Sequence, residues 1–448
     1  MYIHEFVDEG LGHSSYLVEI GETALVVDPP RFPTELEALA LQLHVQIDWT
    51  ADTHSHADYV TGSPALAART HATFLAPAAS RLESPHQPLA DGDEVDLGMS
   101  YSLRALATPG HTPDHMAYLL CDRDGPAALF SGGSLMVGTI GRTDLLGPEQ
   151  AEPLAREMYW SLQNQILSLP DDLPVYPTHG AGSFCSAPGA TERTTTIGEE
   201  KHRNPILRIN DEDSFVNELL SGFGTFPTYF ARLPGLNRRG PRQYDELPEL
   251  ERVDIDTFTM ALRDGAVIVD ARPITAFATG HIPGSLSNAL RPSFASWLGW
   301  IVAPYRPLLF ILNKDQPRTE LIRQCLDVGY EHLVGELAGG IAAWRAHGNT
   351  LATIELVDPD TAAGTVIDVR QAGEYISGHI PKAQNVELGM IAETPIRQGP
   401  LTVACGHGER AMTAASLLAQ KHCEDVRVLT GGPEEWPAAT GQILVVGP

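Results

Sequence analysis

The chain has 448 residues and 43% hydrophobic content, which is enough for several globular domains. No apolar run approaches the roughly 20 residues of a membrane span, and the N-terminus MYIHEFVDEGLGHSS lacks a basic-then-apolar leader, so we expect a cytoplasmic protein. Five scattered cysteines fit a reducing compartment, and a net charge of −27 argues against nucleic acid or an anionic membrane as a partner.

Histidines gather in three short stretches of the first part of the chain. THSHADYVTG carries His54 and His56, which point to one side of an extended segment, and Asp58 follows closely. TPGHTPDHM adds His111 in a glycine turn, and YPTHG adds His179. Imidazole and carboxylate groups that converge in this way are typical metal ligands, so the pattern indicates a metal site.

A proline-containing segment, 206–250, reads as a connector between this part and an internal repeat. VIVDARPITAFATGHIPGSLSNA (267–289) matches VIDVRQAGEYISGHIPKAQNV (366–386) in spacing and character. In both copies β-branched runs alternate with helix-like runs, which favours parallel sheets covered by helices. The repeat therefore predicts two α/β domains, over 251–350 and 355–448.

The second copy of the repeat carries a candidate nucleophile. LTVACGHGERAM places Cys405 between a β-like run and a helix, among glycines that let the loop backbone turn inward. Loop N–H groups at the helix N-terminus, together with Arg410, favour the nucleophilic thiolate over an inert buried thiol. The first copy reads ILNKDQPRTE, with Asn313 at the cysteine position. An amide cannot carry sulfur, so we expect this copy to be a silent spacer or docking surface.

The cysteine loop, the D-x-R run of Asp368 and Arg370, the GHIP element and the GGxxxW ending together resemble the rhodanese family of sulfurtransferases. The resemblance implies that Cys405 accepts a sulfane sulfur as a persulfide. It also implies that the loop N–H groups and Arg410 stabilise the anion.

The histidine contexts THSHADYVTG, PGHTP and YPTHG resemble the metallo-β-lactamase superfamily, and the stretches GRTD and HRNP narrow the resemblance to its persulfide dioxygenase branch. This implies an αβ/βα sandwich over 1–205, followed by the two rhodanese-like α/β domains. It also implies one iron(II) ion held by His54, His111 and an aspartate from an F-[ST]-G-D stretch. Here that stretch reads FSGG, so Gly133 stands at the aspartate position, and Tyr59 replaces a further histidine.

Because glycine supplies no ligand, the occupant of the site stays open. His54, His56 and His111 can form a three-histidine site, which suits zinc as well as iron(II). A weak or altered site and an N-terminal domain without metal are the other options. By the same resemblance, Arg142 in GRTD lies in a region that binds glutathione, unless it forms only a surface salt bridge. Cys185 resembles a cysteine near the metal pocket, which takes sulfur from the substrate or lines the cavity.

The sequence therefore predicts a sulfur-metabolism enzyme, in which a rhodanese-type sulfurtransferase at Cys405 is coupled to a persulfide dioxygenase-like domain. The expected partners are a low-molecular-weight persulfide or thiosulfate and a thiol acceptor, and the family favours a homo-oligomer. Two alternatives remain. The N-terminal domain is a non-catalytic scaffold that presents persulfide or a partner to Cys405, or it is a zinc-dependent thioester hydrolase.

Overall fold

The computed structural model describes residues 1–185, 191–396 and 399–448. The chain divides into two compact units, Met1–Glu246 with Leu326–Gly329, and Leu247–Cys325 with Tyr330–Pro448. Among the described residues, no helix has both the length and the apolar character needed to cross a membrane.

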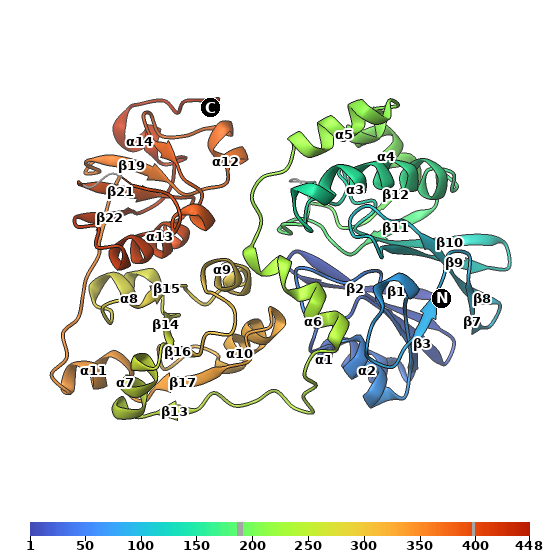
Figure 1. The fold of residues 1–448 in the computed structure, drawn as a ribbon, viewed down its shortest axis with the longest axis horizontal. Helices are drawn as coiled ribbons and strands as arrows, with labels where there is room; N and C mark the ends of the chain where they lie inside the picture. Colours follow the sequence, from blue (N-terminus) through green and yellow to red (C-terminus); the bar gives the residue numbers. More distant parts are fainter. Residues whose placement is uncertain (186–190, 397–398) are drawn as a thin grey trace. The chain divides into compact units, whose positions relative to one another are not determined.

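The first unit is built on two sheets of six described strands each (Figure 1). The first sheet has the strand order β1 (Tyr2–Asp8), β2 (His13–Ile20), β3 (Thr23–Val27), β4 (Gln46–Ala51), β5 (Thr73–Pro77), β6 (Gln87–Leu89). The second sheet has the order β12 (Thr195–Thr196), β11 (Pro174–Pro177), β10 (Gly125–Gly132), β9 (Met116–Asp122), β8 (Tyr101–Ala107), β7 (Glu94–Gly98). The helices of this unit are α1 (Thr34–Leu43), α2 (Ser63–Thr70), α3 (Pro148–Ser161), α4 (Ile197–Arg203), α5 (Glu212–Ser221) and α6 (Leu233–Arg239).

The two sheets pack face to face, because each turns one apolar face inward. One buried cluster joins Tyr16 and Val27 of the first sheet to Tyr118 and Phe130 of the second. On the outer faces, α1 and α2 cover the first sheet, and α3 and α5 cover the second (Figure 1). These four layers are the predicted αβ/βα sandwich, which the structure confirms.

Of the segment 206–250, residues 206–246 fold with the first unit. Its helix α5 begins after Asp211, whose carboxylate accepts the backbone N–H of Ser214 as an N-terminal cap. The buried face of α5 joins the core against the second sheet through Phe215 and Leu219. The segment ends in α6, which lies against the histidine motif described below.

The second unit contains the two copies of the repeat. The first copy forms a parallel sheet in the order β13 (Arg252–Val253), β17 (Leu333–Leu337), β16 (Leu308–Ile311), β14 (Val267–Asp270), β15 (Leu286–Ser287). The second forms a parallel sheet in the order β18 (Glu355–Val357), β22 (Val426–Leu429), β21 (Leu401–Ala404), β19 (Thr365–Asp368), β20 (Gln384–Asn385). The helices are α7 (Ile255–Arg263), α8 (Ile274–Thr279), α9 (Phe294–Ile301), α10 (Arg318–Asp327), α11 (Gly340–Ala346), α12 (Ala372–Ser377), α13 (Glu409–Gln420) and α14 (Trp436–Thr440).

The strand order relative to the chain is the same in both copies, as expected for a duplicated domain. The D-x-R run serves the same structural purpose in each. The guanidinium of Arg370 pairs with Asp368, 2.7 Å between Nη2 and Oδ2, and also donates to the carbonyl of Gly378. Arg272 repeats this contact with Asp270 at 2.6 Å. These buried ion pairs fix the turn after the second strand of each copy.

Candidate functional site

The chemically interesting residues of the first unit follow the carboxyl ends of strands. Asp28 follows β3, and His54 follows β4, which runs parallel to it. In the other sheet, His111 follows β8, Gly133 follows β10, and His179 follows β11. The strands β8, β10 and β11 point the same way, because β8 and β10 are both antiparallel to β9, and β11 is parallel to β10. Their loops can therefore meet at one edge of the sandwich.

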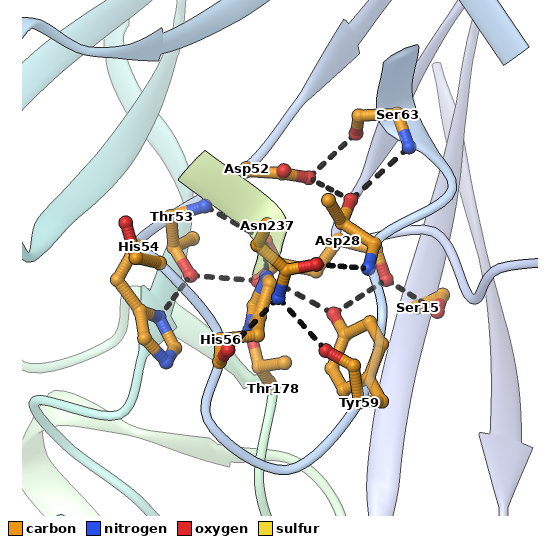
Figure 2. A network of polar contacts seen from close by, with 12 residues as sticks. Ser15, Asp28, Asp52, Thr53, His54, His56, Tyr59, Ser63, Thr178 and Asn237 are labelled. Atoms are coloured by element: carbon orange, nitrogen blue, oxygen red, sulfur yellow. Dashed lines mark hydrogen bonds and ion pairs between the residues drawn. The ribbon is translucent and has the colours of Figure 1, made fainter. Parts of the chain in front are cut away.

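Asp28 is the centre of a buried polar network (Figure 2). Its carboxylate accepts the backbone N–H of Thr53 at 2.7 Å, the Thr53 hydroxyl at 2.8 Å and the Thr178 hydroxyl. It also lies 3.0 Å from Nε2 of His56. Burial alone would lower the pKa of His56, but the Asp28 carboxylate raises it to about 9. The hydroxyl of Tyr59 lies 3.0 Å from the same Nε2. That nitrogen is therefore occupied by protein groups, while Nδ1 of His56 is buried and has no hydrogen-bond partner among the described residues.

Asn237 of α6 holds the motif loop from outside. Its Nδ2 donates to the carbonyl oxygens of His56 and Tyr59, both at 2.9 Å, and its Oδ1 accepts the N–H of Thr61 at 3.1 Å (Figure 2). Asn237 is buried and stands in a segment that reads as a connector. No local pattern in the sequence points to it, since its partners precede it by more than 170 residues.

Three histidines converge in the buried pocket. Ligand nitrogens of His54, His111 and His179 all lie within 4.8 Å of one another. Burial lowers the pKa of His54 and of His111 well below the usual range, and neighbouring histidines add to the effect. Both rings are therefore neutral, which is the form that binds metal. Of the predicted set, the structure brings His54 and His111 together, and it groups His56 with Asp58 and His179 instead.

Gly133 leaves no room for a side chain. A Cβ atom there would lie 2.4 Å from Cδ2 and 2.8 Å from Cγ of His111. The imidazole of His111 thus occupies the volume that a side chain at this position would need. On the other side, the N–H of Gly133 donates to Nε2 of His115 at 2.8 Å, so His115 is a satisfied core histidine. The described residues fit a metal held by histidines, since Nε2 of His111 is buried and has no partner.

Two further predicted residues lie close to this pocket. The guanidinium of Arg142 is 2% exposed and pairs with Asp144 at 2.7 Å, so its donors are already directed at protein groups. Its backbone carbonyl oxygen accepts a hydrogen bond from Nδ1 of His111. Cys185 is fully buried, and burial together with Asp58 raises the pKa of its thiol well above the usual range. A substrate-binding role for Arg142 or Cys185 stays a prediction.

The cysteine loop of the second repeat lies between β21 and α13. Sγ of Cys405 receives the backbone N–H of Gly408 at 3.1 Å and of Ala411 at 3.4 Å. Gly408 has φ of +95°, a conformation that favours glycine and turns the loop N–H groups inward. The thiol is therefore held at the N-terminus of a 12-residue helix, where a negative charge is stabilised.

Cationic groups stand around the cysteine loop. Arg410 forms a two-point ion pair with Glu374, at 2.6 and 2.8 Å. Burial alone would lower the pKa of Arg410, but its bonds to Glu374 and the nearby Cys405 raise it. Arg291, from the first repeat, is within electrostatic range of Cys405 and Glu409 and was not expected from the sequence. It lies far from the loop in the chain, and only the tertiary fold reveals it.

In the equivalent loop of the first repeat, backbone carbonyl oxygens rather than N–H groups make the contacts. Nη1 of Arg318 donates to the carbonyl oxygens of Asn313, Lys314 and Gln316, and Nη2 pairs with Glu336 at 2.7 Å. Carbonyl groups of the loop thus turn toward the guanidinium. That the Asn313 loop does not support sulfur chemistry stays a prediction.

A sandwich with buried histidines at its strand ends is followed by two parallel α/β domains, one of which carries a cysteine loop. These features define the class of the protein as a metallo-β-lactamase-type sandwich joined to two rhodanese-like domains. The family model for the metallo-beta-lactamase superfamily matches residues 8–179, and the model for the rhodanese-like domain matches residues 255–347 and 354–439.

The named relatives below carry names that fit the metallo-β-lactamase part of the chain. Persulfide dioxygenase ETHE1, mitochondrial, of Homo sapiens is 30% identical over 193 residues, which are 42% of this chain and 68% of the relative. A hydroxyacylglutathione hydrolase of Rhodobacter capsulatus is 32% identical over 216 residues, 42% of this chain and 79% of the relative. The solved metallo-beta-lactamase of Staphylococcus aureus subsp. aureus COL superposes with a TM-score of 0.66 at 27% identity, over 75% of this chain and 98% of that chain.

The chain belongs to the metallo-β-lactamase superfamily, with persulfide dioxygenase homologues, and carries two rhodanese-like domains at its C-terminal end. The predicted assignment to sulfur metabolism is confirmed. The hydroxyacylglutathione hydrolase relatives keep thioester hydrolysis as a weaker alternative.

Proposed function

We propose that Cys405 is the nucleophile of a sulfane-sulfur transferase. The observation that carries this proposal is the pair of backbone N–H groups, from Gly408 and Ala411, that converge on Sγ. The thiolate attacks the outer sulfur of thiosulfate or of a persulfide. The new S–S bond forms as the old one breaks, and sulfite or a thiolate leaves with the electron pair.

The second half of the reaction returns the cysteine to its starting state. An acceptor thiolate or sulfite attacks the outer sulfur of the Cys405 persulfide, and the cysteine thiolate leaves with the electron pair. During the resting time between the two steps, the persulfide carries a negative charge on its outer sulfur. The loop N–H groups and the cations Arg410 and Arg291 support that charge.

For the N-terminal domain we propose oxidation of a low-molecular-weight persulfide with iron(II) as the metal. The proposal is supported by the relative named a persulfide dioxygenase and by the neutral histidines of the pocket. When bound, iron(II) supplies open positions and the redox chemistry of dioxygen. The residues of this chain hold the histidines in one tautomer and exclude water through their burial. Glutathione is the thiol carrier that the resemblance suggests, with Arg142 and Cys185 as substrate-binding candidates.

Thioester hydrolysis with zinc is a second candidate, supported by the hydroxyacylglutathione hydrolase relatives. Such hydrolysis in this superfamily uses the second metal position, where Tyr59 replaces a histidine. Nε2 of His56 already contacts Asp28 and Tyr59, which disfavours a second metal ion at that position. We therefore rank hydrolysis below persulfide oxidation.

Thiocyanate formation from thiosulfate and cyanide tests the transferase. Replacement of Cys405 by serine should lower the rate at least about 100-fold, since the nucleophile is removed. Cys423→Ser, a cysteine of the same repeat, is the matched control and should keep the rate. An unchanged rate in Cys405→Ser would overturn the proposal. Oxygen uptake with glutathione persulfide tests the N-terminal domain separately, and thioester turnover with zinc tests the rival.

A further inference from the structure

We propose that His179 takes the place of the missing carboxylate, so that His54, His111 and His179 together form a three-histidine site for one divalent metal ion. This ligand set differs from the set that the family resemblance implies, and from the set with His56. It concerns the residues that hold the metal and does not depend on which reaction the domain performs.

Each of the three rings has one nitrogen that faces surrounding protein groups and one that faces the pocket. If the first nitrogen carries the ring proton, the second has a lone pair available for a metal. Nδ1 of His111 lies 2.8 Å from the carbonyl oxygen of Arg142 and must donate, since a carbonyl can only accept. Nδ1 of His54 lies 2.9 Å from the hydroxyl of Thr53. That hydroxyl already donates to Asp28, so it accepts from His54. Both rings therefore carry the proton on Nδ1 and turn an unprotonated Nε2 inward.

For His179 the outer neighbour is a carboxylate, in an ion-pair contact rather than a hydrogen bond. Its Nδ1 lies 3.2 Å from Oδ2 of Asp58, and its Nε2 lies 3.4 Å from Nε2 of His54. The Asp58 charge favours the proton on Nδ1. An outer carboxylate that orients a histidine is a common feature of metal sites.

Three unprotonated nitrogens then face one another in a buried space. Nε2 of His54 and Nε2 of His179 cannot hydrogen-bond, because neither carries a proton. Nε2 of His111 has no partner at all among the described residues. Lone pairs this close repel unless a cation lies between them. Two nitrogens on a tetrahedral zinc-like ion, each about 2.05 Å from it, stand about 3.3 Å apart, close to the 3.4 Å between His54 and His179.

The backbone fixes His179 at this position. The N–H of Thr178 donates to the carbonyl of Gly132 at 3.0 Å, and the carbonyl of Thr178 accepts the N–H of Ser14 at 2.7 Å. Gly180 is joined to Gly12 at 2.9 Å. The residue is thus tied to both sheets, and its ring does not need to move to reach the other two histidines.

The ligand set changes the charge of the site. Three neutral imidazoles leave the full double positive charge of the ion, whereas two imidazoles and an aspartate would halve it. In a buried site this difference favours an anion at the open position. A persulfide or another sulfur anion is the class of ligand that we expect there.

Metal affinity of the full chain tests the ligand set without any assay of activity. Zinc(II), and iron(II) under anaerobic conditions, are titrated against a competing chelator. We expect one equivalent of metal in the unmodified protein and at least about 100-fold weaker binding in His179→Gln, because a direct ligand is lost. His56→Gln keeps a hydrogen-bonding group beside Asp28 and should bind less than about tenfold more weakly. His202→Gln, on an exposed histidine, is the control.

Two more variants keep the test decisive if a glutamine variant folds poorly. In His179→Gly, added imidazole should restore at least about tenfold of the lost affinity, because it supplies the missing ligand. In Asp58→Asn, affinity should fall about 10–100-fold, since the ligand remains but loses its orienting charge. The proposal is overturned if the unmodified protein binds neither metal. It is also overturned if imidazole fails to restore metal binding to folded His179→Gly. A third contrary result is loss of metal in His56→Gln together with retention of metal in His179→Gln. The last result would assign the ion to a set that contains His56 and lacks His179, such as His54, His56 and His111.

Discussion

Replacement of Gly133 by aspartate restores the residue that the family pattern contains, and we expect it to weaken the site. A Cβ at this position would lie 2.4 Å from Cδ2 of His111. Carbon atoms at rest lie about 3.5–4.0 Å apart, so the ring has to move by about 1 Å or more. It is held on its far side, because Nδ1 bonds to the carbonyl of Arg142 at 2.8 Å. Gly141 also packs against the ring, since a Cβ on Gly141 would lie 2.7 Å from Nδ1 of His111.

The cost follows from these contacts. Overpacking a buried site costs about 1–3 kcal/mol, and loss of the hydrogen bond from His111 adds about 1 kcal/mol. We therefore expect Gly133→Asp to destabilise the first unit by about 2–4 kcal/mol. A displaced His111 should also weaken metal binding about 10–100-fold, the usual effect of a misplaced ligand.

Thermal unfolding and chelator competition measure the two effects in the same samples. Gly133→Ala is the matched control, since it adds only the Cβ, and it should reproduce most of the loss in stability. The reasoning would be refuted by a Gly133→Asp protein that is as stable as the unmodified chain and binds iron(II) more tightly. That result would mean that the pocket has room for the carboxylate and that only the aspartate itself is missing.

Other predictions concern the supports of both sites. Asn237→Ala removes three hydrogen bonds to the motif loop, and at about 1 kcal/mol each the first unit should lose about 3 kcal/mol in a denaturant titration. Asn237→Asp keeps the acceptor but turns a buried carboxylate oxygen toward the two carbonyl oxygens, so it should lose at least as much stability. Equal stability of both variants with the unmodified chain would contradict the role given to α6. In the second unit, burial alone would raise the pKa of Glu374, but Arg410 lowers it below the usual value of 4.5. The ion pair should therefore stabilise the fold above about pH 4.5, and this contribution should be lost as the pH falls through the lowered pKa. Melting temperatures of Glu374→Gln and the unmodified chain should differ at pH 7 and converge near pH 3. A constant difference across this range would show that the pair does not titrate as described.

The order of the domains and the class of each could be predicted from the sequence, because motifs of contiguous residues encode them. GHIP and the D-x-R run recur at one spacing in both copies, and the Cys405 loop and THSHADYVTG are each recognisable as short contiguous motifs. Such patterns depend on residues a few positions apart, whose geometry is set by a single strand, turn or helix start. The predicted sandwich and the duplicated parallel sheets follow from them.

The composition of the histidine site depends on contacts that no local pattern records. His54 and His179 are 125 residues apart in the chain, and their nitrogens meet only because strands of two different sheets end at the same edge. The spacing of His54 and His56 suggests that both face one ion. The folded chain instead turns Nε2 of His56 toward Asp28, because burial of that carboxylate requires a partner. Packing explains the position of Gly133. A close-packed interior leaves no void, and the ring of His111 occupies the space that a side chain at Gly133 would need.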